Sequence, residues 1–164
     1  MNNKLNHRNK QRGLATIDKL AAVTGLVIAI LFLLSQIPKA DYAESLTVLQ
    51  MQVSEIKSAS KTWRKRGTYS GVSMAALCQN NLIDDSYCGG ASPGQNVNAF
   101  GGNITISSPA SNPLLLTIVI TIPNDEDKIN DIAATLAGLT RENCVSANGC
   151  NTIAVSGTSI TLTV

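Results

Sequence analysis

Four cysteines are the residues of this sequence with the most distinctive chemistry. An even number of cysteines in a small exported domain indicates disulfides. Three pairings are possible, and the sequence-local one, which joins neighbours in the chain, is favoured. A zinc site is the alternative, but neither spacing is the C-x2-C pair of structural zinc sites, so no metal is expected. The four residues are Cys78, Cys88, Cys144 and Cys150.

A lone carboxylate, Asp18, precedes a long apolar run. The 19 residues between Lys19 and Lys39 carry no charge, and as a helix they would span roughly 28 Å, the thickness of a bilayer's hydrocarbon core. An ionised Asp among apolar helices costs several kcal/mol unless a cation compensates it. Asp18 is therefore a candidate functional residue, with an N-terminal amine as its expected partner. The alternative is that Asp18 reaches the membrane interface beside Lys19.

The other acidic residues predict no catalytic site. Adjacent carboxylates occur at Asp84 and Asp85 and in residues 125–127, and neighbours of this kind usually face solvent or occupy a helix's first turn. A weak calcium site is the alternative there. No phosphate-loop, dinucleotide-binding or HExxH motif occurs. We therefore expect a protein that is not an enzyme, with no catalytic residue and no cofactor.

The N-terminal charges predict the direction in which the chain crosses the membrane. An excess of Lys and Arg keeps a flanking segment in the cytoplasm, so the residues after the apolar run are expected outside. Cleavage by ordinary signal peptidase is the alternative, but the run ends in SQIPKADYAES without a small-x-small site. Asp18 is the only acidic residue ahead of the run, whereas the cations there are Lys4, Arg8, Lys10, Arg12 and Lys19.

The order of these features resembles the type IV pilin prepilin signature. In QRG-LATID-KLAAVTGLVIAILFLL a basic leader ends at Gly13, Leu14 follows, and Asp18 is the fifth residue after the glycine. The resemblance implies that prepilin peptidase cuts between Gly13 and Leu14 and methylates the new amine. It also implies that Asp18 of one subunit meets the Leu14 amine of the next. The family normally has Glu at the position of Asp18, while Leu14 and the 13-residue leader look more like the type IVb group.

The resemblance divides the chain into four parts. Residues 1–13 are the leader peptide, 14–38 the transmembrane and filament-core helix, 39–66 the amphipathic half of the same helix, and 67–164 the exported head. The leader carries four of the thirteen cations and none of the eleven acids, so its removal changes the net side-chain charge from +2 to −2. It also removes His7, which excludes histidine-based catalytic and metal sites in the mature chain.

Hydrophobic patterning predicts an α+β head. Residues spaced alternately by four and three from Tyr42 to Trp63, all apolar except Ser60, indicate one helical stripe. A helix from about Thr16 to Arg66 is therefore expected, with Pro38 as a point of bending. This long helix on a small antiparallel sheet is the pilin fold that the resemblance implies. The other expected elements are a short helix at Met74–Asn81, strands at Ile104–Ser107 and Leu114–Ile122, a helix capped by Asn124 or Asp125, and a terminal hairpin around Gly157.

The head itself supplies a second resemblance and a charge argument. The stretches NNLIDDSYCGGASPGQNVNAFGGNITIS and GLTRENC resemble type IVb pilins of thin and conjugative pili, which implies that the loop between Cys144 and Cys150 is displayed to partners. From Gly67 onward, two cations stand against seven acids, so no direct nucleic-acid binding is expected. The basic residues 64–66 are expected to complement the helix dipole, with Gly67 ending the helix; DNA contact is the alternative.

The two resemblances imply that the chain is the major structural subunit of a type IVb-like pilus that serves adhesion, aggregation or conjugative contact. The expected partners are further copies of the chain in a helical homopolymer, prepilin peptidase, the pilus assembly platform, minor pilins, and the inner membrane before assembly. The prepilin is expected in a bacterial inner membrane with its head in the periplasm, and afterwards in the extracellular pilus. A minor pilin or a type II secretion pseudopilin is one alternative. An uncleaved signal-anchored periplasmic binding domain is another, in which Asp18 is incidental.

Overall fold

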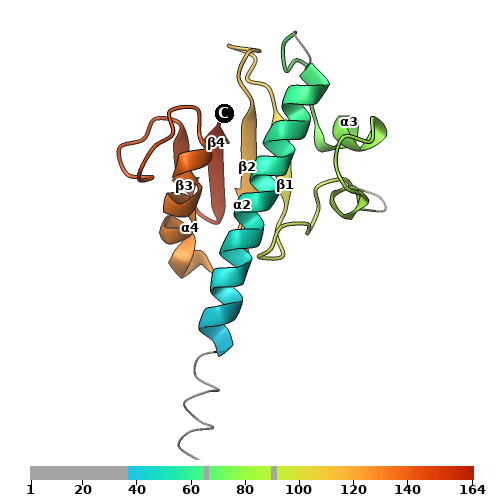
Figure 1. The fold of residues 1–164 in the computed structure, drawn as a ribbon. Coiled ribbons are helices and arrows are strands. Elements are labelled where there is room, and N and C mark those ends of the chain that lie inside the picture. The colour runs from blue at the N-terminus through green and yellow to red at the C-terminus, as the bar shows by residue number, and fades with distance from the viewer. Residues whose placement is uncertain (1–36, 65–66, 90–91) are drawn as a thin grey trace, which may run out of the picture. The chain divides into compact units, whose positions relative to one another are not determined.

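The computed structural model describes residues 37–64, 67–89 and 92–164. The chain divides into two compact units, Met1–Ala43 and Glu44–Val164, and the fold below is that of the second. It is an α+β fold, as the sequence predicts (Figure 1). Its elements are helices α2 (Ile37–Arg64), α3 (Met74–Gln79) and α4 (Ile129–Leu136), 3-10 turns η1 (Asp85–Tyr87), η2 (Glu126–Lys128) and η3 (Ala137–Leu139), and strands β1 (Ile104–Ser107), β2 (Thr117–Thr121), β3 (Ile153–Ser156) and β4 (Ser159–Thr163).

The four strands form one antiparallel sheet in the order β1-β2-β4-β3. Side chains alternate between its two faces, so the register that pairs Ile118 with Leu162 and Ile120 with Ile160 gathers branched apolar residues on one face. The helices α2 and α4 lie across that face in Figure 1. The other face carries mainly Ser and Thr side chains that are exposed or half-buried.

The helical stripe predicted in α2 is the part of the helix that packs on the sheet. Leu49, Val53 and Ile56 are fully buried, and Ser60 is buried with them. Burying an aliphatic side chain of this size contributes about 1.5–3 kcal/mol. The stripe is therefore the main reason why this helix is held against the sheet.

Polar residues of α2 hold the helix beside α4. The Gln50 amide nitrogen donates to the carbonyl oxygen of Thr135 at 2.9 Å, and the Lys57 ammonium donates to that of Leu139 at 2.7 Å. Burial, and then the neighbouring positive charge of Lys61, lowers the pKa of Lys57 below its ordinary value. Carbonyl groups at the end of a helix have no hydrogen-bond partner within the helix, and these two bonds supply partners for carbonyls near the end of α4 and in η3.

The opposite side of α2 is bonded to the segment that connects it to β1. The Gln52 side chain donates to the Val97 carbonyl at 2.8 Å and accepts from the Ala99 amide at 3.1 Å. The Tyr87 hydroxyl donates to Glu55 Oε2 at 2.7 Å. The polar face of α2 therefore joins the helix to the connecting segment, while the apolar face packs on the sheet.

Stability at high pH is expected to depend on Tyr87. Burial, with the hydrogen bond to the Glu55 carboxylate, raises the pKa of Tyr87 well above its ordinary value of 10.0. The folded chain then keeps a proton that the unfolded chain loses, so this contribution is fully present below pH 10.0 and is lost as the pH rises above it. Urea unfolding of the detergent-solubilised chain from about pH 8 to about pH 11 should show a steeper alkaline loss for the wild type than for Tyr87→Phe. Equal losses would contradict the prediction.

The strand predicted at Leu114–Ile122 starts later than expected. The chain forms a turn before β2, in which Asn112 accepts from the Leu114 amide through its side chain and from the Leu115 amide through its carbonyl, both at 3.1 Å. These bonds use the amides of the first two apolar residues, so pairing begins only at Leu116, which exchanges backbone hydrogen bonds with Val164, and the strand itself begins at Thr117. The strand at Ile104–Ser107 and the hairpin around Gly157 are confirmed.

The predicted capping of the acidic helix by Asn124 or Asp125 is wrong. The segment begins as the 3-10 turn η2, in which Asp125 makes no side-chain cap bond. Its carboxylate instead forms an ion pair with Lys128 at 2.8 Å. The short helix α3 does have a side-chain cap, because Ser73 Oγ accepts from the Ala76 amide at 3.1 Å.

Candidate functional site

The residues predicted to direct processing and assembly, Gly13, Leu14 and Asp18, lie outside the described residues, as do 14–36 of the expected membrane span. Within the described part, no helix has both the length and the apolarity needed to cross a membrane. The geometry of these three residues therefore stays a prediction.

The four cysteines form two disulfides with the sequence-local pairing. Cys78 in α3 is joined to Cys88, which follows η1, with their Cα atoms 5.7 Å apart. Cys144 is joined to Cys150, with Cα atoms 6.0 Å apart. Each bridge closes a short loop and contributes about 2–3 kcal/mol in the chain-entropy model. The bridge between Cys144 and Cys150 closes a surface segment with no buried residue of its own, whereas the segment closed by the other bridge contains buried Ile83 and Tyr87.

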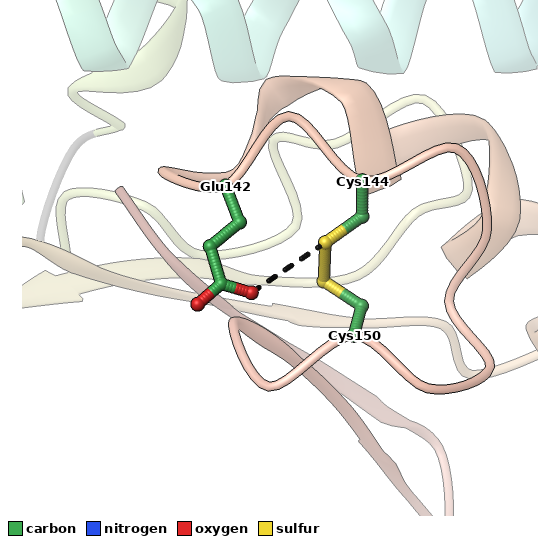
Figure 2. Close-up of side chains that lie close together, drawn as sticks. All are labelled: Glu142, Cys144 and Cys150. Carbon is green, nitrogen blue, oxygen red and sulfur yellow. Dashed lines mark hydrogen bonds between the residues drawn. A yellow bond between two sulfur atoms is a disulfide. The ribbon is translucent and has the colours of Figure 1, made fainter.

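The bridge between Cys144 and Cys150 has the carboxylate of Glu142 beside it (Figure 2). Ligand-type atoms of these three residues lie within 4.8 Å of one another, which is the spacing of a metal site. Metals bind the cysteine thiolate, however, and both sulfurs are bonded to each other. A disulfide sulfur carries no proton, so its 3.9 Å approach to Glu142 Oε2 is a contact without a donor. The arrangement closes a loop and gives no zinc site in the oxidised protein.

The carboxylate clusters bring no three ligand-type atoms together within the described residues. Asp84 Oδ1 accepts from the Ser86 amide at 2.9 Å and caps η1, and this hydrogen bonding lowers the pKa of Asp84. Within the described residues, the only three ligand-type atoms that come together are those of Glu142, Cys144 and Cys150. The pairs and runs of acids therefore act as caps and surface charges.

A basic hollow is the feature that the sequence did not reveal. It is lined by Lys61 and Arg64 at the end of α2 and by Arg141, which follows η3. The sequence placed Arg64 with Lys65 and Arg66 in a helix-end cluster, but those two neighbours lie outside the described residues. The only sequence feature that pointed to this hollow is the spacing of Lys61 and Arg64, which lie three positions apart and therefore on one face of the helix. Nothing in the sequence pattern connects them to Arg141.

Comparison of the chain with protein-family models, with curated proteins and with solved structures finds no match.

Proposed function

We propose that the chain is a pilin-like structural subunit, cut after Gly13 and polymerised through its N-terminal helix into a type IVb-like filament. The observation that carries the proposal is the order of the N-terminal features: basic leader, Gly13, Leu14, Asp18, and then the uncharged run. An apolar helix needs a hydrophobic surrounding, which the bilayer provides before assembly and neighbouring helices provide afterwards.

The described fold supports this proposal in two ways. The stripe of Leu49, Val53 and Ile56 packs α2 on an antiparallel sheet, as expected of a head carried by the end of a long helix. Both disulfides lie in that head, which fits an oxidising location outside the cytoplasm. The membrane-proximal half of the helix and the filament itself remain predictions from the sequence.

Intact mass and N-terminal sequencing of the membrane-extracted protein test the proposal directly. A chain that begins at Leu14 is expected, about 14 Da heavier if its amine is methylated. Without reduction, its mass should be about 4 Da lower than that of the fully reduced chain, because two disulfides are present. A chain that still begins at Met1, or one cut near Ala43, would contradict the proposal and favour an anchored or secreted binding domain.

Abundance distinguishes a major pilin from a minor pilin or a secretion pseudopilin. We propose the major subunit, so the processed chain should be the dominant protein of filaments sheared from the cell surface. A processed chain found there only in traces would instead assign it to the minor pilins or pseudopilins, which share the same N-terminal design.

A further inference from the structure

The basic hollow lies where the end of α2 meets the loop between β1 and β2 and the end of β4. These three segments are at the same end of the sheet in Figure 1. The hollow has a volume of about 290 Å³, and its lining includes the cations Lys61, Arg64 and Arg141 and the side chains of Tyr69, Leu114 and Leu115. Because the lining comes from distant parts of the sequence, the tertiary fold creates it.

The three cations of the basic hollow have no acidic partner among the described residues. No carboxylate in the described structure comes within ion-pair distance of Lys61, Arg64 or Arg141, and no lining side chain is acidic. Three cations and no acidic side chain give the lining of the hollow a positive charge, so the site favours negative ligands.

One of the cations, Arg64, has its guanidinium positioned before any ligand binds. The Arg64 guanidinium carbon lies 4.6 Å from the centroid of the Tyr69 ring, and the Tyr69 amide donates to the Pro113 carbonyl at 2.7 Å. The buried Nε of Arg64 has no hydrogen-bond partner. The backbone of Arg141 is fixed to the end of β4 by its amide, which donates to the Thr163 carbonyl at 2.9 Å. Positioned guanidinium groups bind planar oxyanions at a smaller entropic cost.

The lining also has an apolar part that is open to solvent. Leu114 is 59% exposed, although it is a large aliphatic residue. The Asn112 turn holds it in place, and Leu115 and Tyr69 continue the apolar lining. A binding site that combines a few charged groups with apolar walls suits a ligand with both a charged head and an apolar body.

We propose that the basic hollow binds a small organic anion in which a phosphate or carboxylate group is joined to an apolar body. The oxyanion contacts Arg64, Arg141 and Lys61, and the apolar body contacts Leu114. The volume of about 290 Å³ accommodates a single ring with its charged head group. This binding is independent of filament assembly, so it can be tested on the unassembled chain.

Calorimetric titration of the full chain in a neutral detergent tests the site, with phenyl phosphate, benzoate and inorganic phosphate as probes. Phenyl phosphate or benzoate should saturate one site and bind at least about fivefold more tightly than inorganic phosphate, because the ring buries apolar surface. The tighter of the two ring compounds identifies the preferred head group. If neither saturates by about 10 mM, the proposal is wrong.

Variants assign the binding to these residues. Arg64→Gln and Arg141→Gln should each weaken binding of the tighter ring compound by about tenfold or more. Leu114→Ser should weaken the ring compounds and leave inorganic phosphate unchanged. Lys128→Gln, which removes a cation of η2 outside the hollow, is the matched control and should bind like the wild type.

Circular dichroism of each variant checks whether the fold is retained. If Arg64→Gln loses the fold, Arg141→Gln decides the question, because the Arg141 side chain is exposed and makes no ion pair within the described residues. Wild-type affinity in a folded Arg141→Gln variant would overturn the proposal.

Discussion

An Asp18→Ala variant is expected to be cut between Gly13 and Leu14 like the wild type and to give almost no filaments. The proposed role of Asp18 is to compensate the amine of a neighbouring subunit among apolar helices. Removing one partner of a buried ion pair leaves the other charge uncompensated, at a cost of about 3–5 kcal/mol. Filament recovered by shearing should therefore fall by more than about tenfold. N-terminal sequencing of the membrane fraction and immunoblotting of the sheared fraction measure the two outcomes separately.

The matched control for this variant is Asp18→Glu. It keeps the charge and lengthens the side chain by one methylene, to the residue that the resembled family normally has, so assembly should continue. Filaments in wild-type amounts from Asp18→Ala would mean that Asp18 sits at the membrane interface and sets no register. Loss of cleavage in that variant would instead assign Asp18 to recognition by the peptidase.

The parts of the fold that could be predicted are those in which neighbouring residues decide the outcome. The alternation of apolar and polar residues located β1 at Ile104–Ser107, and the repeat of four and three located the buried face of α2. The beginning of β2 was predicted too early, because Leu114 and Leu115 are as typical of a strand as the residues that follow them. Their amides instead donate to Asn112 in the turn before the strand. Asp125 was misjudged because its local ion pair with Lys128 replaces the cap bond.

Of the features described as candidate sites, only those formed by residues close together in the sequence could be predicted. The two disulfides join cysteines close in sequence, and loop closure favours such pairs. The basic hollow joins the end of α2 to Arg141 and to the turn before β2, so it depends on how the sheet and helices pack. Periodicity carries no information about such contacts between distant segments.

A Gly102→Ala variant is expected to destabilise the head by about 3 kcal/mol or more. A Cβ on Gly102 would overlap the carbonyl oxygen of Thr121 and would lie 2.9 Å from Cδ of Pro123. The Thr121 carbonyl is held in place, because Thr121 belongs to β2 and this carbonyl accepts from Asn98 Nδ2 at 2.8 Å. The same buried Asn98 accepts from the Gly102 amide at 3.0 Å. Relieving the overlap would therefore break the bonds that join this loop to the sheet.

Two other glycines separate this overlap from ordinary effects of substitution. Gly138, in η3, has no atom within 4 Å of the position that a Cβ would take, so Gly138→Ala should change the free energy of unfolding by no more than about 0.5 kcal/mol. Gly101 also faces open space but has a φ of +73°, so Gly101→Ala should cost about 1 kcal/mol through backbone strain alone. Urea unfolding of the three variants should give the order Gly102, Gly101, Gly138, from the largest loss to the smallest. A Gly102→Ala variant no less stable than Gly101→Ala would show that the loop moves away from β2 easily, because Gly102 has no positive φ and its expected loss comes from the overlap alone.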